Sequence, residues 1–343
     1  MKIGTCQSEK EHLAKGELVV AVDAQSNPIA IPILIATGST AGKTIFLSAG
    51  VHGDEINGIE ILQRFINNLD VTALAGMIIF LPLINVSGFR AKDRYVQYDG
   101  KDLNRCFPGD DKGTVSEQIA HTIFTEVVSR CDFGVDIHDS GKGSVLLPHP
   151  AKTKSCVAFC RAHIKDDTGG YDSSRLDDIA VFGTDIIMLC SLRSPTTSSY
   201  GKGMDGVLTI EAYKHFGIPA LTVEVGGAMI LWEEFIQRAL VGLNNILIYQ
   251  GMLEGKMILP KEQFLIPGED DISIKARMEG ILKLKTFLGK AVDRGEELAE
   301  IYNPITLERE VILAKECGVV HDLNVSAKVN EGEDVVGVLE FAT

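Results

Sequence analysis

Three side chains that can bind a metal ion stand at the ends of two apolar segments. The first segment, residues 44–50, ends in glycine and is followed by His52-Gly53-Asp54-Glu55. The second, residues 133–137, is followed directly by His138. Two imidazoles and one carboxylate form a ligand set that holds Zn²⁺ at about 2.0–2.2 Å and leaves one position open for water. The pattern predicts that His52, Glu55 and His138 bind one Zn²⁺ per subunit.

A polar loop lies between these two segments and contains Asp102-Leu103-Asn104-Arg105. Glycines and Pro108 around it favour a loop over a helix or strand. Its residue types suit a site: Asp102 can orient a ligand histidine, Asn104 can hold a substrate, and Arg105 can grip a carboxylate with two parallel hydrogen bonds.

Apolar strand-like segments alternate with amphipathic helical segments over the first 255 residues. This order predicts an α/β fold with a mixed, mostly parallel sheet and helices on both faces. The carboxyl ends of strands in such a sheet converge on one crevice, so we expect His52 and His138 to meet there. The expected strands are 17–23, 29–37, 44–50, 76–84, 133–138, 185–192 and 219–225, and the expected helices are 54–69, 115–129 and 231–252.

The pattern changes near residue 256, where helical periodicity gives way to short alternating strands. Two segments echo each other, because Val292-Asp293-Arg294-Gly295-Glu296 resembles Val329-Asn330-Glu331-Gly332-Glu333. The chain therefore divides into an expected catalytic domain, 1–255, and a small all-β domain, 256–343, similar to the barrel-sandwich of lipoyl and biotinyl carriers. The turn Tyr302-Asn303-Pro304-Ile305 lacks the lysine that such carriers modify, so we expect this domain to shape the site.

Composition narrows the possible partners. A formal net charge of −14 repels phosphate backbones and anionic lipids, so we expect neither nucleic acid nor membrane partners. Seven scattered cysteines without a C-x-x-C pair fit reduced thiols, and no signal peptide begins the chain. These features predict a cytoplasmic protein that acts on a small molecule, and they leave a homo-oligomer open.

Four motifs together resemble the succinylglutamate desuccinylase/aspartoacylase branch of the zinc carboxypeptidase superfamily. They are, in chain order, His52-Gly53-Asp54-Glu55, Asp102-Leu103-Asn104-Arg105, Asp136-Ile137-His138 and Thr222-Val223-Glu224-Val225-Gly226. The resemblance spans about residues 40–230, and the extra C-terminal β-domain is also similar to that branch. It implies a zinc carboxypeptidase-like fold for the first domain.

The resemblance also implies a role for each matching residue. Glu224 would be the general base that activates the zinc-bound water, and Asp102 would hold His52 in its ligating tautomer. Asn104 and Arg105 would bind the carboxylate of an amino-acid substrate. Arg94 would polarise the scissile carbonyl.

Several further residues stay open at this point. Arg90 competes with Arg94 for the carbonyl. Asp136, two residues before His138 on the same strand face, is a candidate to orient a ligand, and His149 is a weaker pocket candidate. The resemblance also implies an arginine that binds the carboxylate of the acyl group, and no residue matches it clearly. Lys142, Arg193 and Lys202 are alternatives for this role. Residues 191–204 could form a loop over the site.

The implied activity is hydrolysis of the amide bond of an N-acylated amino acid or a related small amine. One alternative is a zinc carboxypeptidase that acts on short peptides. Another is a family member that binds a metabolite without catalysis.

Overall fold

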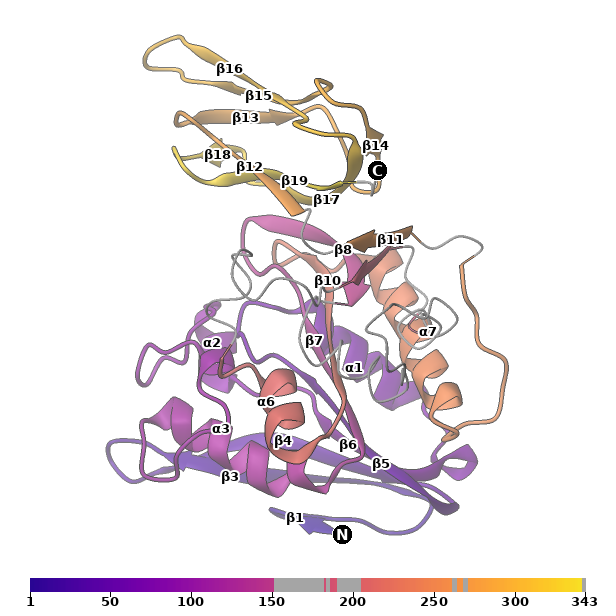
Figure 1. The fold of residues 1–343 in the computed structure, drawn as a ribbon. Helices are drawn as coiled ribbons and strands as arrows, with labels where there is room; N and C mark the ends of the chain where they lie inside the picture. Colours follow the sequence, from indigo (N-terminus) through magenta and orange to yellow (C-terminus); the bar gives the residue numbers. More distant parts are fainter. Residues whose placement is uncertain (151–181, 183–185, 190–204, 261–263, 268–270, 341–343) are drawn as a thin grey trace.

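A mixed sheet of 11 strands runs through the described part of the protein, which in this computed structural model comprises residues 1–150, 182, 186–189, 205–260, 264–267 and 271–340. Figure 1 shows its central strands between two layers of helices. The strands follow the order β12 (Asp271–Lys275), β19 (Asp334–Glu340), β17 (Gly318–Asn324), β8 (Ser144–Pro150), β10 (Ala220–Gly227), β7 (Phe133–His138), β5 (Thr40–Ala49), β6 (Ala75–Leu81), β4 (Pro28–Thr37) and β3 (His12–Val22), and β14 (Ala291–Val292) pairs with β17. The predicted mixed α/β sheet with helices is confirmed. It is not mostly parallel, because among its described strands only the pairings β5–β6, β5–β7 and β7–β10 are parallel, and the flanking and C-terminal strands add antiparallel pairings on both sides.

Parallel pairing is concentrated at the centre of this sheet. The neighbours β6, β5, β7 and β10 run parallel, whereas the strands on both sides of them pair antiparallel. All six residues of β7 are buried, as expected for a strand that is covered on both faces. The carboxyl ends of four parallel strands therefore lie at one edge, where the chain can present side chains together.

Helices cover both faces of the sheet, as the sequence predicts (Figure 1). On one face, α1 (Asn57–Asn68) packs beside α7 (Glu233–Tyr249) over a core that includes Phe65, Phe80 and Leu243. On the other face, α3 (Val115–Glu126) and α6 (Leu208–Phe216) cover a second core that includes Phe46 and Phe124.

Helix boundaries follow local chemistry. A capping box starts α3, in which the Thr114 backbone N–H donates to Glu117 Oε2 at 2.7 Å. The predicted helices 54–69 and 115–129 are both too long: α1 begins at Asn57 because the residues before it form a turn, and a 3₁₀ turn at Val128–Arg130 follows α3. The sequence pattern does not predict α6, which ends at Phe216 and is capped by Gly217 with φ of +69°.

The C-terminal strands form two packed layers. Four of them, β12, β14, β17 and β19, extend the large sheet through the pairing of β17 with β8. The second layer is a four-stranded sheet made of β16 (Arg309–Leu313), β15 (Glu297–Tyr302), β13 (Gly280–Leu284) and β18 (Lys328–Val329). An apolar core that includes Leu298, Ile301 and Val336 fills the space between the layers. A domain boundary at residues 255–256 stays a prediction.

The remaining described elements are short. The expected strand 185–192 is β9 (Ile186–Leu189), which pairs with β11 (Phe264–Pro267) in a separate two-stranded sheet. A second small sheet pairs β1 (Lys2–Ile3) with β2 (Cys6–Gln7), and a 3₁₀ turn, η1, spans Val71–Ala73. None of the helices in the described residues is long and apolar enough to cross a membrane.

Candidate active site

Three neighbouring parallel strands bring the candidate residues together. His138 is the last residue of β7, and in the sheet register it lies beside Glu224 of β10. His52 follows the end of β5, where Gly50 turns the chain with φ of +64°. Gly53 lets this loop touch α2 (Val86–Ala91), because a Cβ on Gly53 would lie 2.0 Å from the Gly88 carbonyl carbon. The convergence expected at the strand ends is therefore observed.

His52, Glu55 and His138 form a buried cluster that could hold a metal ion. One ligand atom from each lies within 4.8 Å of the other two, and the three residues are only 2–3% exposed. Glu55 Oε1 lies 2.5 Å from His52 Nδ1, and Glu55 Oε2 lies 2.7 Å from His138 Nδ1. The carboxylate thus stands between the two nitrogens that an ion would bind.

A second layer of carboxylates holds both imidazole rings from behind. His52 Nε2 lies 3.1 Å from Asp102 Oδ1, and His138 Nε2 lies 2.8 Å from Asp136 Oδ2. Ser48 fixes Asp136 by donating its hydroxyl to Oδ1 at 2.7 Å. In the tautomer with the proton on Nε2, each Nδ1 lone pair faces Glu55, so the donor set fits a metal ion.

The electrostatics of this cluster match a cation site. Burial disfavours the charged imidazoles, yet Glu55 with Asp102 raises the pKa of His52, and Asp136 with Glu55 raises that of His138. The imidazoles in turn hold the pKa of Glu55 well below its usual range, despite its burial. The surrounding negative charge favours a positive charge between the rings, whether protons or an ion supply it.

Glu224 has the opposite environment. Removal from water raises its pKa to about 8, with Glu55 and Asp139 adding to the effect and His138 opposing it. A carboxylate that gains and loses its proton near neutral pH can serve as a general base and acid. Its position beside His138 places the Glu224 carboxyl next to the candidate metal site formed by His52, Glu55 and His138.

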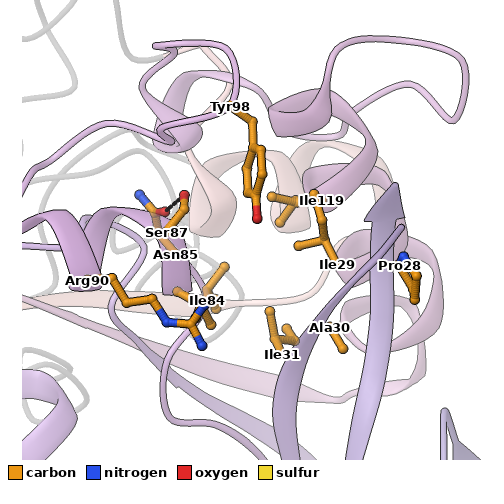
Figure 2. Close-up of a pocket in the computed structure, with 11 residues that line it drawn as sticks. Pro28, Ile29, Ala30, Ile31, Ile84, Asn85, Ser87, Arg90, Tyr98 and Ile119 are labelled. Atoms are coloured by element: carbon orange, nitrogen blue, oxygen red, sulfur yellow. Dashed lines mark hydrogen bonds between the residues drawn. The ribbon is translucent and has the colours of Figure 1, made fainter. Parts of the chain in front are cut away.

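Arg94 lies at the cluster, whereas Arg90 lies elsewhere. The Arg94 guanidinium donates from Nη2 to Asp102 Oδ2 at 2.9 Å, and its Nη1 is 3.5 Å from Glu55 Oε1. Arg90, on α2, instead lines a separate cavity together with Tyr98 (Figure 2). The geometry thus favours Arg94 over Arg90 as the cation near a substrate carbonyl.

Asn104 and Arg105 occupy the short 3₁₀ turn η2 (Leu103–Arg105) beside the cluster. Asn104 is buried, and its Oδ1 accepts the backbone N–H of Leu208, the first residue of α6, at 3.1 Å. Its Nδ2 lies 3.5 Å from His138 Nε2. Arg105 is exposed and donates to the Asn104 carbonyl at 2.7 Å. Arg105 can therefore reach a substrate, whereas the Asn104 amide also braces α6.

Two buried carboxylates near the site, Asp139 and Asp54, are not among the candidates that the sequence predicts. Asp139 accepts the backbone N–H and the side-chain amide of Asn57 at 3.0 and 2.9 Å, which anchors the start of α1. Burial, with Glu55, raises the pKa of Asp139 to about 7. Asp54 is 6% exposed, and within the described residues its Oδ1 has no hydrogen-bond partner. Their positions, next to His138 and to Glu55, were the only signal.

Of the remaining candidates, Lys142 is exposed and follows the strand end that carries His138. The side chain of His149 and all of Arg193, Lys202 and the expected loop 191–204 fall outside the described residues.

A family model for the succinylglutamate desuccinylase/aspartoacylase catalytic domain matches residues 41–250. This stretch contains the metal cluster, η2 and Glu224. The chain belongs to the succinylglutamate desuccinylase/aspartoacylase family.

Two curated relatives illustrate its range. The N-alpha-acetyl-L-2,4-diaminobutyric acid deacetylase of Halomonas elongata is 27% identical over 91% of this chain and 86% of that protein. The succinylglutamate desuccinylase of Ectopseudomonas mendocina is 27% identical over 71% of this chain and 65% of its own length. Both names describe enzymes that remove an acyl group.

Solved structures share the fold. A succinylglutamate desuccinylase/aspartoacylase from Rhodobacter sphaeroides aligns with a TM-score of 0.78 at 22% identity over 96% of both chains. The product-bound ectoine utilization protein EutE (DoeB) from Ruegeria pomeroyi has a TM-score of 0.78 at 23% identity over 100% of both chains. The similarity therefore includes the C-terminal strands.

The raised pKa of Glu224 predicts a pH-dependent stability in metal-free protein. An ordinary glutamate titrates near pH 4.5, so the folded chain binds this proton more tightly than the unfolded chain. The stabilisation is complete below about pH 4.5 and is lost as pH rises through about 8. The side chain of Glu224→Gln cannot ionise, so the variant does not lose this stabilisation. Its free energy of unfolding should therefore rise relative to that of wild type as pH increases from about 4.5 to 8, by at most about 1.4 kcal/mol per pH unit.

Urea unfolding of chelator-treated protein at a series of pH values measures this difference. Glu331→Gln, on an exposed turn, controls for the loss of one carboxylate elsewhere. A difference between Glu224→Gln and wild type that stays constant from pH 5 to about 8 would contradict the prediction.

Proposed function

We propose that this protein is a zinc-dependent amidohydrolase that removes the acyl group from an N-acylated amino acid or a related small amine. The observation that carries the proposal is the position of Glu55 between the Nδ1 atoms of His52 and His138, with Glu224 beside them in the sheet. Family membership and the deacylase names of the relatives support the same reaction class.

His52, Glu55 and His138 would hold the Zn²⁺. When bound, the ion would supply a Lewis acid and would acidify water at neutral pH. Asp102 and Asp136 keep the two imidazoles in the ligating tautomer, so that the donor set is formed before the ion arrives.

The protein's own groups then move the proton. Glu224 accepts a proton from the attacking water and returns it to the nitrogen of the departing amine. Arg94 donates hydrogen bonds to the carbonyl oxygen as negative charge develops there, while Asp102 fixes the guanidinium at 2.9 Å. Arg105 would hold the carboxylate of the amino-acid part.

The charges around the site favour a substrate with a neutral acyl group and a second, cationic amine. Asp54 is buried next to Glu55, and its Oδ1, which has no partner among the described residues, can accept a hydrogen bond from an ammonium group. A second carboxylate on the acyl group would meet this negative charge. The relative from Halomonas elongata is named for a substrate of the favoured kind, an acetylated diamino acid.

The metal assignment predicts about one zinc per subunit in the purified chain. His52→Ala and His138→Ala should each lower zinc content strongly, because each variant removes one of three protein ligands. Elemental analysis after dialysis measures the ratio. His12→Ala, at an exposed position on β3, is the matched control and should retain full zinc. Full zinc in the His52→Ala/His138→Ala double variant would place the metal elsewhere.

Binding and chemistry should separate in two variants. Glu224→Gln should keep the fold and the zinc but lower kcat by about 10²–10⁴, which is the usual worth of a general base. Arg105→Ala should act mainly on KM, since its grip on the carboxylate need not change between ground and transition states. Steady-state kinetics on zinc-loaded protein, with Glu331→Gln as control, measures both. Normal turnover by Glu224→Gln would remove this residue from the mechanism.

A substrate panel separates the deacylase from the carboxypeptidase. We expect kcat/KM for the best N-acyl amino acid to exceed that for any tripeptide by at least about tenfold, or roughly 1.4 kcal/mol of transition-state binding. Within the panel, an N-acetyl diamino acid should exceed N-succinylglutamate. Release of free amine is the readout. Faster cleavage of peptides would establish the carboxypeptidase instead, and zinc binding without any hydrolysis would support a metabolite-binding protein.

A further inference from the structure

We propose that a cavity behind α2 is a second ligand site, separate from the metal cluster, that binds a small organic monocarboxylate with an apolar body. The cavity has a volume of about 220 Å³ and lies between the start of β4, helix α2 and helix α3 (Figure 2). An apolar cavity of roughly 150 Å³ is enough to bind benzene, so this one has room for a ring or a branched chain that carries one small charged group.

The floor of the cavity is apolar. Ile31, Ile84 and Ile119 line it, and each is at most 3% exposed. Ile29 adds a further apolar wall. A ligand body that covers these side chains gains from the removal of apolar surface from water.

Two hydrogen-bond donors reach into the cavity beside these isoleucines. Figure 2 shows the Arg90 guanidinium and the Tyr98 hydroxyl entering it from different sides. Within the described part of the chain, neither side chain has an ion pair or hydrogen bond, whereas Asn85 and Ser87 are already paired with each other. A guanidinium has several N–H donors in one plane and matches the two oxygens of a carboxylate.

The charge pattern around the cavity selects an anion. None of the described residues that line it is Asp or Glu, although the chain carries a formal net charge of −14. The acidic residues closest in sequence to Tyr98 and Ile119 already have partners. Asp99 accepts a hydrogen bond from the Ser116 hydroxyl at 2.7 Å, and Glu117 forms an ion pair with Lys101 at 2.9 Å. Among the residues that the structure describes, Arg90 is therefore a positive charge without an acidic partner, and no acidic side chain lines the cavity.

The cavity is distinct from the proposed active site because α2 lies between them. Gly88 of α2 packs directly against Gly53 of the metal loop. Asn85, the N-cap of α2, donates to the Arg94 carbonyl at 3.2 Å, while the Arg94 side chain points to Asp102. Arg90 thus faces one side of this helix and the metal cluster the other.

Titration of 4-fluorobenzoate, followed by ¹⁹F NMR on the full chain as purified, tests the proposal. Wild type should show saturable binding, and Arg90→Gln should weaken it by at least about fivefold through loss of the charged pair. The neutral 4-fluorobenzamide, which has nearly the same size, should bind wild type at least about fivefold more weakly than the acid. Tyr98→Phe should also weaken binding of the acid.

Three controls separate this site from the active site and from non-specific attraction. Binding should be unchanged in His138→Ala, which removes a proposed metal ligand, in Arg105→Gln, and in Lys112→Gln, which removes an exposed positive charge elsewhere. Arg90 and Tyr98 are exposed, so their variants should fold, and thermal unfolding checks this. The proposal is overturned if wild type shows no saturable binding, if Arg90→Gln binds as well as wild type, or if binding disappears in His138→Ala or Arg105→Gln.

Discussion

One buried carboxylate, that of Glu55, sets the conditions for the rest of the site. Its two oxygens face two imidazole nitrogens at 2.5 and 2.7 Å, in a region from which water is almost excluded. Such a charge is costly to bury unless it is compensated. Asp102 and Asp136 behind the rings add further negative charge, so the whole arrangement demands positive charge at its centre.

The sheet explains how this arrangement is reached. Parallel strands β5, β7 and β10 end at one edge, and their register places Glu224 beside His138. Removal from water, with Glu55 and Asp139 nearby, raises the pKa of Glu224 to about 8, while the imidazoles lower the pKa of Glu55. Two glutamates on either side of His138 thus acquire opposite tendencies: Glu55 stays charged, whereas Glu224 can exchange a proton.

Much of this could be predicted from the sequence, because strand ends and apolar runs are local signals. The convergence of His52, Glu55 and His138 follows from them. Helix α6 is not predicted because it has only nine residues, and its first backbone N–H, that of Leu208, donates a hydrogen bond to Asn104, which is distant in sequence. Tertiary packing also decides two further features that no local sequence pattern shows. It brings Asp139 to Asn57, and it directs Arg90 to the cavity on one side of α2 and Arg94 to the candidate metal site on the other.

The central claim is that an ion lies between the Nδ1 atoms of His52 and His138. Anomalous diffraction at the zinc edge, from crystals of zinc-loaded protein, tests this directly. We predict one peak about 2.0–2.2 Å from both Nδ1 atoms and from an oxygen of Glu55. A peak within bonding distance of the Nε2 atoms instead, or one beside residues outside this cluster, would contradict this assignment of the metal site.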